Sequence, residues 1–319
     1  MSTKPLVSII IPCKKIDEYT KESIAGCKLL EYENFEIIVL PDFQSDIIKG
    51  VKIIPTGAVS PGVKRNFGIK NSAGEFCAFI DNDAYPKSDW ILNALKYLED
   101  PQVGGVGGPG LTPESDGFMQ KAGGYVLSSF MVGQLSNRYK VQYNFESDDV
   151  HSCNFIAKKS VIEAAGGWNE KYWPGEDTLM CLAIKKTGKK LIESSDVVVY
   201  HHRRSLFGPH AKQVSRFGEH RGFFVKKFPE NSIKITYFFP SILLISLLVG
   251  GLISIVFPLF LSVLLVGLLA YLAAGLIATI SLQLNDIKLI FVVWVGIIVT
   301  HLVYGSYFLT GLAKRDLKR

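Results

Sequence analysis

The sequence predicts an α/β domain with a mostly parallel sheet, followed by a group of membrane-spanning helices. Two observations support this prediction. Short apolar, β-branched runs alternate with helix-like segments through the N-terminal part of the chain. The segment from Ile235 to Leu284 contains no Asp, Glu, Lys or Arg. With 319 residues, the chain is long enough for one large α/β domain and this second part.

The predicted strands are short apolar runs bounded by Pro, Gly, Asp or Asn. They are Val7–Ile11, Phe35–Leu40, Val51–Ile54 and Phe76–Ile80, and the predicted helices are Glu18–Leu30 and Val63–Asn71. Because the strands are continuously apolar, we expect a parallel sheet covered by helices on both faces. The glycine-rich segment Gly104 to Gly110 is predicted to be a strand and tight turn, since it lacks the Lys and the element order of a phosphate loop.

The C-terminal part is predicted to cross a membrane three times. A bilayer core needs about 20 apolar residues per helix. Thr236 to Ser281 is long enough for two spans with a break at Pro258, and Leu289 to Leu312 gives a third. The N-terminal run from Val7 to Ile11 is too short for a signal peptide. We therefore expect an integral membrane protein with a cytosolic N-terminal domain.

The net charge of +6 is concentrated ahead of the first predicted span. The basic pairs are Lys185-Lys186, Lys189-Lys190, Arg203-Arg204 and Lys226-Lys227. Such residues mark the cytosolic side and favour anionic headgroups, so we expect membrane lipids, and no nucleic acid, as partners. Three spans would, however, place the basic end from Lys314 to Arg319 outside, against the positive-inside bias. A re-entrant segment within Thr236 to Ser281 would remove this conflict.

The cysteines do not indicate a zinc site or a disulfide framework. There are five, which is an odd number, and none forms a closely spaced pair: Cys13, Cys27, Cys77, Cys153 and Cys181. A reducing compartment fits this pattern.

Asp81-Asn82-Asp83 directly follows the predicted strand Phe76–Ile80. In parallel sheets, ligands bind beyond the carboxyl ends of the strands. Two neighbouring carboxylates repel each other unless a cation is present, and Mg²⁺ or Mn²⁺ bound together with a diphosphate would satisfy them. Such an ion would neutralise the charge on a nucleoside diphosphate leaving group. For an isolated triplet the alternative is a turn that closes the strand.

Several further motifs occur in a fixed order around this triplet. They are Val7–Pro12, Glu36–Val39 ending in Asp42, Lys64–Gly68 and Gly74–Phe76 before it, and Asn154, Gly166–Glu170 and Gly175–Asp177 after it. Together they closely resemble the family 2 glycosyltransferases over essentially the whole predicted soluble domain. The resemblance implies a Rossmann-like GT-A fold, a nucleotide-sugar donor and a divalent cation, Mg²⁺ or Mn²⁺.

The resemblance also implies roles for individual residues. Pro12 and Asp42 would flank the nucleotide base, and Arg65 and Asn66 would lie near the nucleotide and sugar. Asp81, Asn82 and Asp83 would bind ribose, diphosphate and metal, with Asp83 as the metal ligand. Two segments, Cys13-Lys14-Lys15 and Pro41-Asp42-Phe43-Gln44, depart from the family's usual Tyr-Asn and Asp-Asp-Gly-Ser. The base is therefore left open.

Asp177 matches the family's general base, and we group its neighbour Glu176 with it as catalytic. Direct displacement at an anomeric carbon needs a carboxylate to accept the proton of the acceptor hydroxyl, and it inverts the configuration. Acidic residues are also favoured at a helix N-terminus. The two residues can therefore serve as catalytic carboxylates and also stabilise the start of a helix.

Gln213 and Arg216 resemble the Gln-x-x-Arg-Trp motif of synthase-type members, with Phe217 in place of Trp. An Arg here could bind diphosphate. Val214, Phe217, Phe224 and Phe228 recur at helical spacing among basic residues, which is typical of an amphipathic helix at a membrane surface. A surface helix docked on the sheet is the alternative.

His201 and His202 follow the predicted strand Val197–Tyr200. In many GT-A enzymes a histidine at a comparable place is a third metal ligand, so we predict both as candidate ligands. The alternative is a histidine satisfied by protein groups or by solvent.

We therefore predict a cytosolic GT-A domain at residues 1–205, an amphipathic interface segment at 206–234 and transmembrane helices at 235–319. The predicted reaction is inverting sugar transfer from a nucleotide-sugar donor to a polyprenyl-phosphate or other lipid-linked acceptor at the cytosolic membrane face, in glycan or polysaccharide biosynthesis. A processive polysaccharide synthase, a nucleotidyltransferase on a similar sheet and a catalytically silent binding protein remain alternatives.

Overall fold

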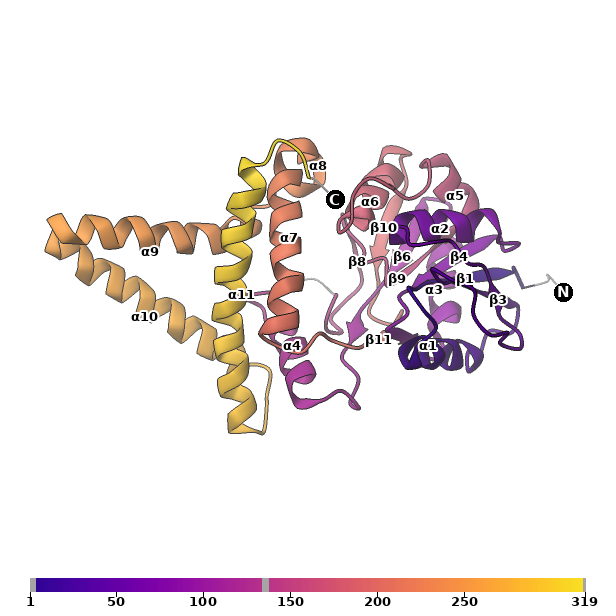
Figure 1. Ribbon diagram of the computed structural model, residues 1–319, viewed down its shortest axis with the longest axis horizontal. Helices are drawn as coiled ribbons and strands as arrows, with labels where there is room; N and C mark the ends of the chain where they lie inside the picture. The colour runs from indigo at the N-terminus through magenta and orange to yellow at the C-terminus, as the bar shows by residue number, and fades with distance from the viewer. Residues whose placement is uncertain (1–3, 134–137, 318–319) are drawn as a thin grey trace. The chain divides into compact units, whose positions relative to one another are not determined.

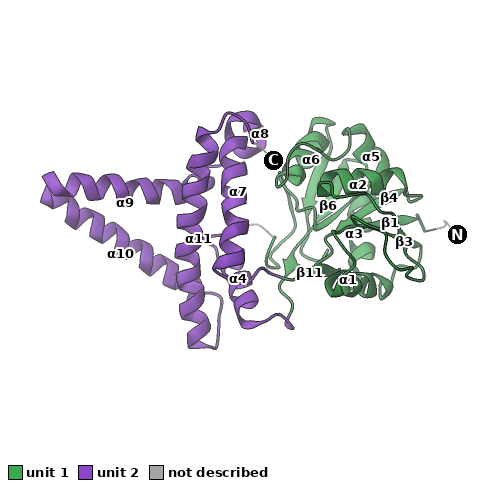
Figure 2. Cartoon of the chain, in the orientation of Figure 1, with its two compact units in different colours: residues 1–113, 136–202 green, residues 114–135, 203–319 purple. Residues whose placement is uncertain are grey.

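The computed structural model describes residues 4–133 and 138–317. The chain divides into two compact units (Figure 2). The first unit contains residues 1–113 and 136–202, and the second contains residues 114–135 and 203–319. The second unit thus includes a segment inserted in the middle of the first.

The first unit is built on a mixed eight-stranded sheet with the order β3-β2-β1-β4-β9-β6-β10-β8. Its strands are β1 (Val7–Pro12), β2 (Phe35–Leu40), β3 (Lys52–Ile53), β4 (Phe76–Ile80), β6 (Val103–Gly107), β8 (Phe145–Glu146), β9 (Asn154–Lys158) and β10 (Lys190–Glu193). The strands β1 to β4 run parallel to one another, as predicted. The strand β9 lies antiparallel between β4 and β6, and β8 pairs antiparallel with β10. These two reversals were not predicted.

Helices cover both faces of this sheet (Figure 1). They are α1 (Glu18–Lys28), α2 (Pro61–Lys70), α3 (Trp90–Leu98), α5 (Lys159–Ala164) and α6 (Glu176–Lys186). Ile9 packs with residues of α1 and α3, whereas its neighbour Ile10 packs with residues of α2, α5 and α6. Because successive side chains of a strand point to opposite faces, a strand that is buried on both faces must be apolar throughout. This explains the continuous apolar runs in the sequence.

A small second sheet, β5-β11-β7, continues from the acidic triplet. It consists of β5 (Ala84–Pro86), β11 (Val199–His201) and β7 (Gly110–Leu111). The antiparallel register pairs His201 with Ala84, the residue after Asp83. The glycine-rich turn makes the close approach that was expected, because a Cβ on Gly108 would lie 2.2 Å from the Val197 carbonyl oxygen. The pairing of β5 with β11 thus brings His201 to the acidic triplet.

The second unit is helical in its described residues. Its elements are α4 (Phe118–Ser128), α7 (Gly208–Lys227), the short α8 (Pro229–Ser232) and η1 (Ile235–Tyr237), and then α9 (Phe239–Val256), α10 (Pro258–Ile280) and α11 (Ile287–Ala313). Three of these helices, α9, α10 and α11, are long and apolar enough to cross a membrane. They lie close to the predicted bounds, and α10 begins at the predicted break, Pro258. The chain therefore has the apolar helices of a membrane-associated protein.

Candidate active site

A buried arginine on α2 connects the two acidic motifs of the first unit. The Arg65 side chain is 2% exposed. Its Nη2 donates to Asp81 Oδ1 at 2.9 Å and to Ser152 Oγ at 3.0 Å, and its Nη1 donates to Glu176 Oε1 at 2.8 Å. The guanidinium also stacks over the Trp168 ring, 4.8 Å from its centre. One cation thus ties the triplet after β4 to the start of α6.

Because Arg65 and Glu176 are both buried, keeping them charged costs free energy of desolvation. A charge removed from water is tolerated only when it is paired and hydrogen-bonded. Burial raises the pKa of the Glu176 carboxyl to about 7, while the Arg65 cation acts to lower it and Asp177 to raise it further. Glu176 therefore titrates near neutral pH, with Arg65 favouring its charged form.

The start of α6 presents both predicted catalytic carboxylates. Gly175 has a φ of 111°, a left-handed conformation that glycine adopts without strain. Glu176 and Asp177 then occupy the first helical turn, where the helix dipole favours negative charge. Asp177 is half-buried, and its Oδ1 accepts the backbone N–H of Thr178 at 2.8 Å. The helix start thus fixes the predicted base, so both readings of this motif are compatible.

Asp81, Asp83 and His201 form a candidate divalent-metal site. One ligand atom from each lies within 4.8 Å of the others. His201 Nε2 is 3.1 Å from Asp83 Oδ1. Two carboxylates and one imidazole are a donor set suited to a divalent cation.

The charge state of His201 also fits a cation site. Burial alone would lower the pKa of His201, but Asp83 and Cys153 outweigh it and raise the pKa to about 10. A raised pKa favours the protonated, positively charged imidazole at this position. Because only the neutral imidazole is a metal ligand, a bound cation would replace that proton.

The structure gives His202 different partners. Its Nε2 lies 2.9 Å from Glu22 Oε2, and its ring packs against Tyr19 with the centroids 4.5 Å apart. Of the two predicted histidine ligands, only His201 belongs to the group of three found among the described residues. His202 instead joins β11 to α1.

The predicted base-binding residues lie at the ends of β1 and β2. Pro12 is paired in register with Leu40, and Asp42 follows two residues later. The buried Lys64 Nζ is 2.7 Å from Asp42 Oδ1 and donates to Thr56 Oγ1 at 2.8 Å. Lys64 was not among the predicted site residues, although it precedes Arg65 in the sequence. It positions the carboxylate that was predicted to contact the base.

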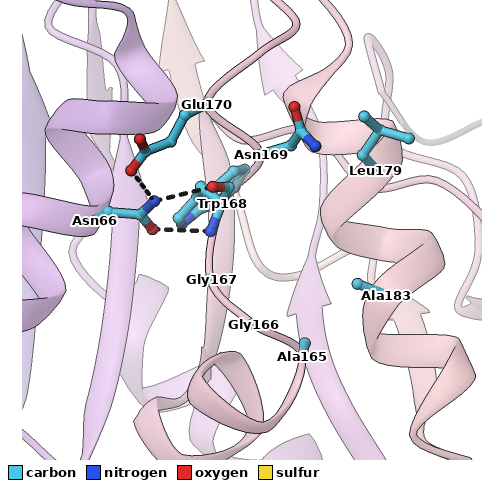
Figure 3. A pocket seen from close by; sticks show the side chains of 9 residues that line it. All are labelled: Asn66, Ala165, Gly166, Gly167, Trp168, Asn169, Glu170, Leu179 and Ala183. Atoms are coloured by element: carbon cyan, nitrogen blue, oxygen red, sulfur yellow. Dashed lines mark hydrogen bonds between the residues drawn. The ribbon is translucent and has the colours of Figure 1, made fainter.

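Asn66 is engaged with a loop of the protein itself. Its Oδ1 accepts the Trp168 N–H at 2.8 Å, and its Nδ2 donates to the Trp168 carbonyl and to Glu170 Oε1, both at 2.9 Å (Figure 3). These three residues help to line a pocket of about 370 Å³, together with Leu179 and Ala183 of α6. Asn66 therefore holds the 166–170 loop, and its contact with a donor stays a prediction.

Two further predicted groups have other surroundings. Asn82 Nδ2 donates to Thr20 Oγ1 of α1 at 3.2 Å. Gln213 and Arg216 lie on α7, which is the predicted helix but belongs to the second unit. Their roles in donor binding stay predictions.

Residues 8–164 match the model of glycosyl transferase family 2. The chain therefore contains a family 2 glycosyltransferase domain. A relative of this glycosyltransferase is the dolichyl N-acetyl-alpha-D-glucosaminyl phosphate 3-beta-D-2,3-diacetamido-2,3-dideoxy-beta-D-glucuronosyltransferase of Methanococcus voltae. The two are 24% identical over 271 residues, which are 79% of this chain and 84% of that protein. The pre-mycofactocin glycosyltransferase of Mycobacterium tuberculosis is 29% identical over 148 residues, 46% of this chain and 31% of its own length.

A solved structure confirms the predicted GT-A fold. It is a mannosyltransferase from Pyrobaculum calidifontis in complex with GDP-Man and Mn²⁺. It matches with a TM-score of 0.58 at 16% identity, over 99% of this chain and 89% of that one. The expectation of a glycosyltransferase is therefore confirmed at the level of family and fold.

Proposed function

We propose that this glycosyltransferase moves a sugar from a nucleoside-diphosphate donor, with inversion, to a polyprenyl phosphate or lipid-linked glycan at the cytosolic membrane face. The observation that carries the proposal is the Arg65 bridge from Asp81 to Glu176. It joins the carboxylates that would face the diphosphate to the helix start that carries Asp177. Donor and base would then meet at one edge of the sheet.

The chemistry follows from the roles of these groups. As the acceptor oxygen bonds to the anomeric carbon, the bond from that carbon to the diphosphate oxygen breaks and Asp177 accepts the hydroxyl proton. Attack from the face opposite the leaving group inverts the anomeric configuration. A divalent cation held by Asp81, Asp83 and His201 would neutralise the diphosphate as it leaves. A polyprenyl phosphate acceptor is already ionised and would need less from Asp177.

Other observations support the choice of donor, acceptor and side. The Pyrobaculum calidifontis structure contains GDP-Man and Mn²⁺, and the Methanococcus voltae relative is named for a dolichyl-linked sugar phosphate. Apolar helices would bring this enzyme to such an acceptor. The basic pairs ahead of α9 favour the cytosolic face.

The decisive experiment incubates membranes containing the enzyme with a panel of labelled nucleotide sugars. We expect label in the lipid extract when Mn²⁺ or Mg²⁺ is present and its loss when the cation is chelated. Asp177→Asn should abolish transfer to a hydroxyl acceptor, whereas Asp46→Asn, at an exposed loop carboxylate, should not. Label in a long polymer would favour the processive synthase instead, and full transfer by Asp177→Asn would remove the proposed base.

A further inference from the structure

Within the second unit, α7 and α11 run side by side in the same direction (Figure 1). Contacting pairs advance together along both helices and their flanks. They are Leu206, just before α7, with Gly296; His210 with Thr300; Gly222 with Phe308; and Lys226 with Lys314, just after α11. The backbones touch, because a Cβ on Gly222 would lie 2.1 Å from the Phe308 carbonyl oxygen and one on Gly311 would lie 2.0 Å from that of Glu219. The two helices therefore form one packed pair along the length of α7.

The helix α7 does not have the composition of a membrane-embedded helix. Its charged residues are Lys212, Arg216, Glu219, Arg221, Lys226 and Lys227. Charged side chains are costly in hydrocarbon and are rare in membrane spans. Since α11 accompanies α7 throughout, α11 cannot cross the hydrocarbon while α7 remains outside it.

The apolar character of α11 has another explanation, which is packing inside the protein. In its most apolar window 28% of the residues are buried, against 6% in α9 and 6% in α10. Val293 and Ile297 pack with Val126 of α4 and Leu206. Lys314 at its end pairs with Glu219 of α7 at 2.6 Å. The helix α11 is thus packed against protein along one side, to a much greater extent than α9 or α10.

The helices α9 and α10 extend from α11 as a hairpin (Figure 2). The base of the hairpin is fixed to α11, because Ser241 Oγ donates to the Gly305 carbonyl at 3.0 Å and Trp294 Nε1 donates to the Leu272 carbonyl, also at 3.0 Å. At 18 residues, α9 is about 27 Å long, close to the roughly 30 Å of a hydrocarbon core. The hairpin has the length needed to enter a bilayer.

The tip of this hairpin contains no polar loop. Phe257 alone joins the two helices. Its neighbours are apolar and exposed, with Ile255 at 78%, Val256 at 69% and Leu259 at 78%. A tip that emerged on the far side of a membrane would place these side chains in water, which is unfavourable. The composition of the tip favours a position inside the hydrocarbon.

We propose that only the α9–α10 hairpin enters the bilayer, with its tip inside the hydrocarbon, and that α7 and α11 lie together at the membrane surface on the catalytic side. The partner of the exposed hairpin is lipid. This arrangement replaces the three spans expected from the sequence and does not depend on which sugar is transferred. It also keeps Lys226 and Lys314 on one side, which agrees with the positive-inside bias.

Single reporter cysteines in the full-length protein test this topology. All five native cysteines are buried, so the wild type provides a low background. The reporters are Lys70→Cys, Asn285→Cys and Leu317→Cys, with Phe257→Cys at the tip. In sealed vesicles of known orientation, a membrane-impermeant maleimide should label the first three from the same side. Phe257→Cys should stay unlabelled from both sides until detergent is added.

Two of these reporters can overturn the proposal. Labelling of Leu317→Cys from the side opposite to Lys70→Cys would establish an odd number of crossings. Labelling of Phe257→Cys from that opposite side would show that the hairpin traverses the bilayer. Since a tip substitution could disturb insertion, a protease site appended after Arg319 provides a second measurement on the unaltered hairpin. We expect cleavage from the catalytic side only, and cleavage from the other side alone contradicts the proposal.

Discussion

At the scale of single residues, Arg65 is the group on which the candidate site depends. It contacts Asp81 and Glu176 while almost fully buried. Removing one partner of a buried ion pair typically costs about 3–5 kcal/mol, because the charge left behind is neither solvated nor paired. Arg65 therefore affects both the stability of the first unit and the relative positions of Asp81 and Glu176.

We predict that Arg65→Gln strongly lowers both sugar transfer and thermal stability. Arg65→Lys should retain more stability but little transfer, because an ammonium cannot reproduce the two-sided fork of a guanidinium. Transfer rates and unfolding midpoints in detergent would measure both effects. Lys70→Gln, at an exposed cation near the end of the same helix, is the matched control. Wild-type transfer by Arg65→Lys would contradict the bridging role.

Glu176 should give stability a distinctive dependence on pH. Its pKa is raised by burial from 4.5 to about 7. A carboxyl group with a raised pKa in the folded state favours folding while it is protonated. This contribution to the free energy of unfolding is fully present below the unfolded-state pKa of 4.5 and is lost as the pH rises through the folded-state pKa of about 7. The stability of the wild type relative to Glu176→Gln should therefore fall between pH 5 and pH 8, as measured by parallel unfolding curves. An increase over this interval would mean that Arg65 lowers the pKa by more than burial raises it.

Sequence reasoning identified residues whose position follows from strand ends and motif order. Asp81, Asp83 and His201 were all named in advance, and the structure groups them. It did not identify Lys64 as the partner of Asp42, or Glu22 as the partner of His202. These pairs join distant parts of the chain, and no local pattern in a single sequence marks them.

At the scale of elements, the strands β2 and β4 have the predicted bounds, and the apolar helices lie close to theirs. The direction of β9 was not predictable in the same way. An apolar run shows that a strand is buried but not which way it runs, since both directions present side chains with the same period. Glycines with a positive φ at turns are more informative about local structure, because other residues rarely adopt that backbone conformation.

The loop that contacts Asn66 provides a matched pair of glycines. Gly166 and Gly167 both have positive φ, and a Cβ on Gly167 would lie 2.9 Å from Asn66 Oδ1, whereas one on Gly166 meets nothing within 4 Å. We predict that each change to Ala costs about 1 kcal/mol through backbone strain. Only Gly167→Ala should also reduce transfer, by displacing Asn66. Equal transfer by the two variants would show that the Asn66 contact does not matter to the site.

At the scale of the whole molecule, the two units are interleaved in the sequence. Residues 114–135 belong with the helical unit, although the chain then returns to the sheet. Composition revealed the apolar C-terminal helices, but it did not reveal this insertion, because α4 has ordinary polarity and its partners come much later in the chain. Ala122 and Val126 are buried with Ala278 and Val293.

We predict that a chain ending at residue 205 is poorly soluble, since it exposes the face of α4 that α11 normally covers. Replacing residues 114–135 of that shorter chain by a flexible Gly-Ser linker should increase its soluble yield, which size-exclusion chromatography would measure. If the linker made no difference, the apolar face of α4 would not be what limits solubility.

Because α4 lies early in the sequence, it is synthesised long before the helix it packs against. It leaves the ribosome before β9, β10 and β11 exist, yet its packing partner α11 follows all of these strands and is the last helix among the described residues. During that interval its apolar residues have no native partner, while α9 and α10 must already engage the lipid. Delivery of the nascent chain to the membrane and completion of the helical unit are therefore coupled events, and a delay in the first leaves the second unfinished.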